Sequence, residues 1–154
     1  MANNRFPLQT LLDLSHARMD DAARKLGQLL AGEQEGAQKL TLLMQYRDEY
    51  HQRFLDAARQ GVDRELWANY QAFLGRLDEA IAQQQAALAT SRQRTTDGQR
   101  AWLDQRNKAK AFDTLSQRHL AALHRAEGRA EQKMSDEHAA KTMHGMDKDD
   151  EPTN

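Results

Sequence analysis

Apolar side chains recur every three or four residues along most of this chain. In the first half, the row comprises Leu8, Leu12, Ser15, Met19, Ala22, Leu26, Leu29, Leu40, Leu43, Tyr50 and Phe54. In the second half, it comprises Trp67, Tyr70, Leu74, Leu77, Ile81, Gln84, Leu88, Trp102, Ala109, Phe112, Leu123, Ala126 and Ala130. A narrow row of this period is typical of coiled-coil helices, in which it faces the partner helix. We call this row the seam; it predicts an all-α protein of two long helices.

The two rows are separated by a short bend, residues 60–63, whose residue types end one helix and begin the next. Gly61 can adopt the left-handed conformation that ends a helix. Asp63 can accept hydrogen bonds from the free amides that open the following helix. Val62 and Trp67 occupy the two positions of a hydrophobic staple around that cap. Because so short a connection joins antiparallel neighbours, the pattern predicts a helical hairpin.

The expected elements are a helix over 8–59, the bend, a helix over 64–141 and a disordered acidic tail over 142–154. Together they are expected to form a single domain over 1–154, an antiparallel coiled-coil hairpin. The second helix is the longer one. At a rise of 1.5 Å per residue, roughly 25–30 of its residues are expected to extend beyond the first helix. Such an end needs a surface on which to dock.

Two stretches weaken the seam. In the first, Gly27, Gly32 and Gly36 flank Glu33, and each interior glycine costs about 1 kcal/mol relative to alanine. This region is therefore expected to be the softest part of the first helix. The second stretch, residues 95–98, has the sequence Thr-Thr-Asp-Gly. It could form a turn, but we expect it to stay helical because the apolar period resumes in nearly the same phase.

Composition agrees with long solvated helices. The chain has 154 residues, of which 39% are hydrophobic and 29% charged, with a formal net charge of −1. Its mean hydropathy is −0.92. Pro7 and Pro152 are the only prolines, so no proline interrupts the region between them. There is no cysteine, no secretory signal pattern and no apolar run near the roughly 20 residues that cross a bilayer. We therefore expect a cytoplasmic protein.

No motif for catalysis, cofactor binding or metal binding is present. The histidines lack the spacing of a zinc protease site, and no phosphate-binding glycine loop occurs. We therefore expect a protein that is not an enzyme and has no cofactor. Residues 92–133 contain ten basic and five acidic side chains, a net charge of +5. This stretch fits a solvated coiled-coil face, an acidic protein partner, or less readily nucleic acid or anionic lipid. A self-assembling filament is a further alternative.

Several short segments together resemble one protein family. They are Asp20-Asp21-Ala22-Ala23-Arg24, Tyr46-x-x-Glu49-Tyr50, Trp67-x-Asn69-Tyr70-Gln71-x-Phe73, Leu77-x-x-Ala80-Ile81 and Ala126-Glu127-x-Arg129-x-x-Gln132-Lys133-x-x-Asp136-Glu137. In this order the chain resembles the flagellar export protein FliJ family. The resemblance implies a soluble component of the flagellar type III export apparatus, and the stalk of a virulence secretion system remains a close variant.

The resemblance also implies partners. A protein of this family is the central stalk in the hexameric ring of the export ATPase, contacts the cytoplasmic domain of the export gate and escorts export chaperones. It would associate with the inner membrane indirectly, through the gate, and would bind no nucleic acid. The implied gate face here is Phe73, Leu77, Ala80 and Gln84. Gln84 replaces the family histidine. Alternatively, Phe73 only widens the seam.

The far end of the second helix is expected to enter the ATPase ring. Ala126 and Ala130 continue the seam where little of the first helix remains to cover them, and basic residues form a second row at four-residue spacing. The expected contact residues are Arg125, Glu127, Arg129, Gln132 and Lys133. The alternative is that this end merely frays.

Overall fold

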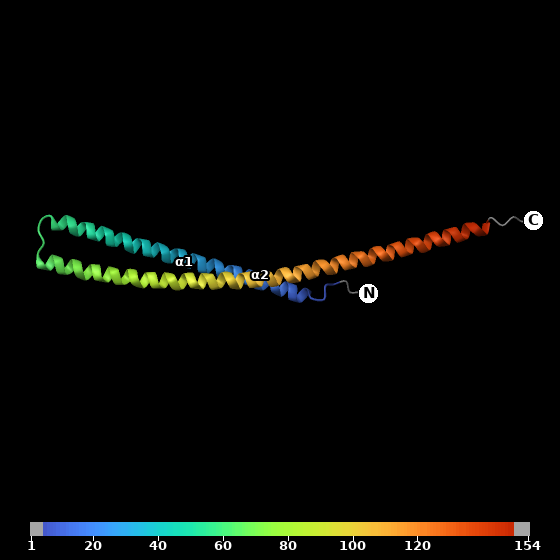
Figure 1. Ribbon diagram of the computed structural model, residues 1–154, viewed down its shortest axis with the longest axis horizontal. Helices are drawn as coiled ribbons and strands as arrows, with labels where there is room; N and C mark the ends of the chain where they lie inside the picture. Colours follow the sequence, from blue (N-terminus) through green and yellow to red (C-terminus); the bar gives the residue numbers. More distant parts are fainter. Residues whose placement is uncertain (1–4, 150–154) are drawn as a thin grey trace, which may run out of the picture. The chain divides into compact units, whose positions relative to one another are not determined.

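The computed structural model describes residues 5–149, of which 147–149 are described by backbone alone. It consists of helix α1, Gln9–Ala58, and helix α2, Arg64–Asp149 (Figure 1). No strand occurs among the described residues. The predicted all-α hairpin of two long helices is confirmed.

The helix bounds agree with the sequence except at the end of α2. Residues 142–149 were expected in the disordered tail but are helical in the structure, since they contain no proline that would break the helix. Residues 150–154 of the expected tail lie outside the described residues.

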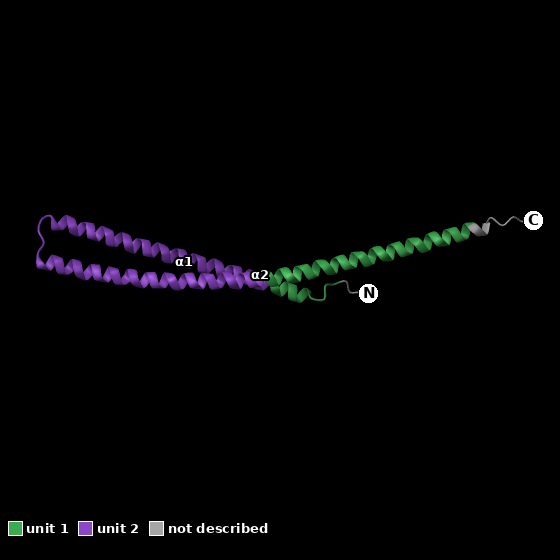
Figure 2. Ribbon diagram, in the orientation of Figure 1, with its two compact units in different colours: residues 1–16, 107–154 green, residues 17–106 purple. Residues whose placement is uncertain are grey.

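The contacts divide the chain into two compact units (Figure 2). Unit 2 is residues 17–106, and unit 1 combines residues 1–16 with 107–154. Each unit contains parts of both helices. The prediction of a single domain over 1–154 came from the length of the chain, which is enough for one domain of ordinary size.

The bend has the geometry that its residue types predict. Gly61 has a φ of +114°, a value that side chains with a Cβ rarely adopt. Its amide donates to the carbonyl of Ala58 over 3.1 Å, which closes the last turn of α1. The carboxylate of Asp63 accepts a hydrogen bond of 2.7 Å from the amide of Leu66, so it caps the first turn of α2.

The predicted seam is the buried side of both helices. Its most buried members are Leu12, Ser15, Tyr70, Leu77, Ile81, Leu88 and Ala109. Ala126 and Ala130 lie beyond its buried part. Two assignments are wrong: Leu8 is 37% exposed and Trp67 48%, and Leu66 takes the inward position beside Trp67. The indole instead lies at the edge of the seam, with its ring centroid 5.8 Å from that of Phe54. The bend therefore shifts the inward row by one residue at the start of α2.

The polar stretch in the middle of α2 lies against α1 within unit 2. As predicted, α2 stays helical there. Thr95 is 5% exposed, and its hydroxyl donates to the carbonyl of Ser91 at 3.1 Å and lies 3.4 Å from that of Leu29. A Cβ built on Gly98 would lie 2.7 Å from Cδ1 of Leu29. The small residues of this stretch thus allow α1 to pack closely, whereas sequence reasoning regarded the stretch only as weak.

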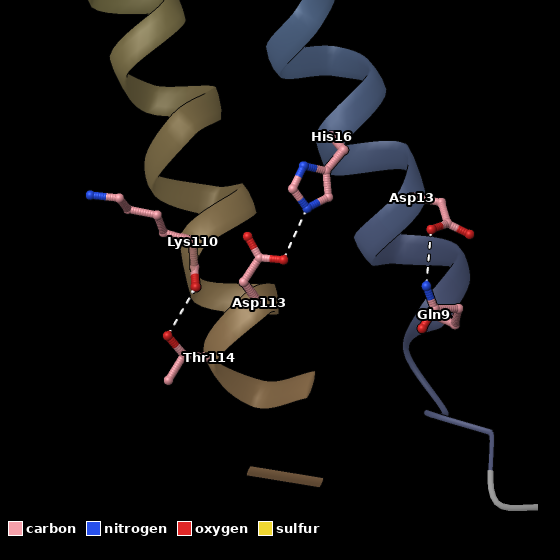
Figure 3. A network of polar contacts seen from close by, with 6 residues as sticks. All are labelled: Gln9, Asp13, His16, Lys110, Asp113 and Thr114. Atoms are coloured by element: carbon pink, nitrogen blue, oxygen red, sulfur yellow. Dashed lines mark hydrogen bonds and ion pairs between the residues drawn. The ribbon is translucent and has the colours of Figure 1, made fainter. Parts of the chain in front are cut away.

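In unit 1, a polar contact joins α1 to α2 (Figure 3), and a ring contact joins the residues just before α1 to α2. Nε2 of His16 lies 2.9 Å from Oδ1 of Asp113. The rings of Phe6 and His119 are 5.6 Å apart at 49°. Ala109, in the α2 part of this unit, is 2% exposed.

Candidate partner-binding surfaces

The first candidate surface lies near the bend and combines residues of both helices. We call it the bend-proximal surface and define it as Tyr46, Glu49, Tyr50, Arg53, Phe73 and Leu77, which line a cavity of about 180 Å³. Phe73 is 38% exposed and Tyr46 51%. The rings of Phe73 and Tyr50 are 4.2 Å apart at 49°. The carboxylate of Glu49 and the guanidinium of Arg53 lie beside this open, mainly apolar cavity. Such a cavity can accept an apolar side chain of a partner whose neighbouring residues are polar.

The four predicted gate residues differ in their exposure. Phe73 is exposed, Ala80 is half-buried, and Leu77 is 9% exposed because it lies on the seam. The Gln84 amide donates to the carbonyl of Gly36 over 3.1 Å, so it bridges the two helices. Of the four, Phe73 therefore offers the most surface to a partner, whereas Leu77 and Gln84 hold α1 and α2 together.

Stacked aromatic rings lie behind this surface. Phe54 and Tyr70 stack with centroids 3.9 Å apart at 17°, and Tyr50 stacks on Tyr70 at 5.8 Å. The Tyr70 hydroxyl lies 2.5 Å from Nδ1 of His51. Ring stacking of this kind stabilises beyond the apolar area that it buries. The stack therefore gives Phe73 a packed support.

An ion pair joins the helices at the side of the seam. Nε of Arg47 donates to the carboxylate of Asp78 over 2.6 Å. This hydrogen bond, and the carboxylate charge with it, raise the pKa of Arg47 above its ordinary value. Both side chains are about half exposed, so the pair orients the helices more than it stabilises them.

The α1 members of the bend-proximal surface were not predicted as binding residues. Tyr46 and Tyr50 are four residues apart, a spacing that places two aromatic rings on one side of a helix. This was the available signal. Glu49 and Arg53 share the same spacing but are charged residues on a charged helix, so nothing in the sequence sets them apart.

The second candidate surface is the part of α2 that α1 does not cover. We call residues 124–146 the uncovered segment, because every side chain in it is exposed. Leu123, just before it, is the last half-buried residue among the side chains that the structure describes. Figure 2 shows the α2 part of unit 1 continuing well past the short α1 part of the same unit. The segment remains helical to its end.

The five residues predicted to contact the ATPase ring all lie on the uncovered segment. The Gln132 amide donates to the carboxylate of Asp136 over 3.0 Å, and Glu127 lies 3.9 Å from His124. Among the described side chains, none forms an ion pair with the other three, Arg125, Arg129 and Lys133. These three cations are therefore exposed charges on the uncovered segment.

The described part of the chain contains neither a metal site nor a membrane-spanning helix. Over residues 5–146, no group of three or more histidine and acidic side chains could hold a metal ion. Neither helix, within its described length, has a stretch apolar and long enough to cross a membrane.

The family model and the similar proteins of known family agree with one another. A family model described as Flagellar FliJ protein matches residues 4–146. A Flagellar FliJ protein from Salmonella typhi is 35% identical over 132 residues, which cover 86% of this chain and 90% of the relative. A Flagellar FliJ protein from Escherichia coli K12 is 33% identical over 132 residues, which again cover 86% of this chain and 90% of the relative. Both candidate surfaces lie within the matched range.

Proposed function

This chain belongs to the flagellar FliJ protein family, and we propose that it acts as the central stalk of the flagellar export ATPase. Family membership supports a part in flagellum assembly and flagellar protein export. In the proposed role the uncovered segment enters the ATPase ring, and the bend-proximal surface contacts the cytoplasmic domain of the export gate. The single observation that carries the proposal is that α2 stays helical over 124–146 with every side chain exposed.

The uncovered segment has two rows of side chains suited to a ring interior. One row consists of the small residues Ala126 and Ala130, which permit a close approach. The other consists of Arg125, Arg129 and Lys133 at four-residue spacing, so the three cations follow one side of the helix. Helices that line a ring and carry carboxylates would complement both rows. Charge on an exposed helix also speeds association, in a manner that depends on ionic strength.

Truncation after Leu120 tests the stalk assignment. The shortened protein retains the whole of unit 2 and every contact of the bend-proximal surface. It is expected to keep its helicity and its affinity for the gate domain while losing stimulation of the ATPase hexamer. Full stimulation by the truncated protein would show that the ring contacts another part of the chain.

A charge variant tests the basic row without removing the segment. Replacing Arg125, Arg129 and Lys133 by alanine together is expected to weaken binding to the ATPase and to reduce its salt dependence. The matched control replaces Arg100, Lys108 and Lys110, which are exposed cations on the covered part of the same helix. If both triple variants lost the same affinity, net charge and not the basic row would be responsible.

The gate contact is tested with Phe73→Ala. This change removes a ring that is 38% exposed and rests on Tyr50, so it is expected to weaken gate binding with little loss of helicity. Leu103→Ala is the control, since Leu103 is 43% exposed on α2 but lies outside the bend-proximal surface. Leu77→Ala is less suitable, because truncation of a buried leucine costs about 2–5 kcal/mol of stability. Unchanged gate affinity in folded Phe73→Ala would reject the assignment.

The remaining roles rest on the family resemblance. We include the escort of export chaperones and an indirect association with the inner membrane through the gate domain. Co-sedimentation with inner-membrane vesicles tests the second role, because it should require the gate protein. Vesicle binding in its absence would contradict an indirect association.

A further inference from the structure

The uncovered segment carries three strongly exposed methionines. Met134 and Met143 are each 71% exposed, and Met146 is 69% exposed. By contrast, Met19 is half-buried on the seam and Met44 is 42% exposed. An accessible thioether is readily converted to methionine sulfoxide, which makes a flexible apolar side chain polar, and reductases reverse the change. The three side chains are thus comparable in their access to an oxidant.

Only one of the three lies in line with the seam. Met134 follows Leu123 by eleven residues, so at about 100° per residue it lies about 20° from Leu123 around the helix. Met143 and Met146 lie roughly 160° and 140° away from it. The row that continues the seam past Leu123 is therefore Ala126, Ala130 and Met134. Met134 is the only large apolar side chain on this row.

We propose that Met134 is a redox-sensitive contact residue, which anchors the uncovered segment to its partner as a thioether and releases it as a sulfoxide. The inference rests on the proposed function, in which the partner is the export ATPase. An unbranched thioether adapts to the irregular gaps of an apolar surface. A sulfoxide oxygen buried in the same gap would need a hydrogen-bond donor that the gap of an apolar anchor does not supply.

The oxidant is a hydroperoxide, for which hydrogen peroxide is the probe. The sulfur lone pair attacks one peroxide oxygen, the O–O bond breaks and an S–O bond forms. The sulfur loses two electrons and the peroxide gains them. The proton on the transferred oxygen passes to the second oxygen, which with hydrogen peroxide leaves as water. In the free protein Met134 contacts solvent on most of its surface. Oxidation is therefore expected to leave the fold unchanged and to act only on binding.

Two full-length variants separate Met134 from the other methionines. The first, Met143→Leu with Met146→Leu, keeps Met134 as the single methionine of the uncovered segment. The second, Met134→Leu, keeps the other two and preserves an apolar side chain at 134. Each is treated with hydrogen peroxide, the sulfoxides are located by peptide mass spectrometry, and binding to the purified ATPase hexamer is measured. Circular dichroism checks that helicity is unchanged.

Peroxide is expected to weaken ATPase binding of the first variant about tenfold, the effect of one unsatisfied polar group in an interface. Methionine sulfoxide reductase should restore it, and peroxide should leave the ATPase affinity of Met134→Leu at the value of the untreated variant. The inference is overturned if the oxidised first variant binds as before, or if Met134→Leu is equally sensitive. Truncation after Leu120 separates this from the proposed function. If truncation abolishes binding while oxidation has no effect, only the role of Met134 fails; if the truncated protein binds normally, the stalk assignment fails.

Discussion

Replacing Gly27 by alanine is expected to stabilise the protein, whereas the same change at Gly98 is not. Both glycines lie within helices, where alanine is favoured over glycine by about 1 kcal/mol. A Cβ built on Gly27 would have no atom within 4 Å, so the full gain should be realised. A Cβ on Gly98 would lie 2.7 Å from Cδ1 of Leu29, well inside the roughly 3.5–4.0 Å of a favourable carbon contact.

The magnitude at Gly98 follows from what has to move. Cδ1 is the flexible end of the Leu29 side chain, so it can rotate away from α2, and the cost lies near the lower end of the roughly 1–3 kcal/mol that overpacking typically takes. This cost offsets the gain of about 1 kcal/mol in helix propensity, so the net effect of Gly98→Ala is close to zero. The two variants should therefore differ by about 1 kcal/mol, although the chemical change is identical.

Thermal unfolding followed by circular dichroism at 222 nm measures this difference. For a chain of this length, 1 kcal/mol corresponds to roughly 2–4 °C in Tm. Gly27→Ala should raise Tm by that amount, and Gly98→Ala should leave it nearly unchanged. Gly32→Ala is a second control, because a Cβ there also has no neighbour within 4 Å. Equal increases at Gly27 and Gly98 would refute the close approach of α1 to α2 at Leu29.

Two further substitutions test the bend and the seam. Asp63→Ala should lower the free energy of unfolding by about 1 kcal/mol in urea denaturation, because the Leu66 amide loses its acceptor. Asp63→Asn keeps a side-chain oxygen and should lose much less stability than Asp63→Ala. Equal losses from the two variants would show that the capping hydrogen bond is not the cause. Leu88 is 4% exposed, so Leu88→Ala should lower the free energy of unfolding by about 2–5 kcal/mol. Leu42 is 48% exposed, so Leu42→Ala should change it by no more than about 0.5 kcal/mol. Similar losses from both leucines would contradict the observed seam.

Sequence reasoning predicts the bend well because its determinants are local. Gly61 and Asp63 act on the backbone within a few residues of themselves, so their types suffice to place the end of one helix and the start of the next. The seam is also predictable, since burial repeats with the helix period. Trp67 is one exception, because the choice between it and Leu66 depends on the angle at which α2 leaves the bend.

Features that depend on contacts between the helices were predicted less well. The approach of Leu29 to Gly98 needs the alignment of the two helices, which neither sequence pattern contains by itself. For the same reason, Tyr46 and Arg53 could not be assigned to one surface with Phe73. The candidate site was therefore predicted where one helix carries it, and incompletely where both helices do.

The arrangement of contacts in unit 2 has a consequence for the order of folding. Contacts between the helices join residues farther apart in sequence with distance from the bend: His51 and Tyr70 are 19 residues apart, Arg47 and Asp78 31, Gly36 and Gln84 48, and Leu29 and Thr95 66. Closing the longest of these loops costs about 1.1 kcal/mol more chain entropy than closing the shortest. The stacked aromatic rings are among the contacts with the smallest separation. Folding is therefore expected to begin at the bend and to proceed along the two helices away from it. The contact farthest from the bend should form last and open first.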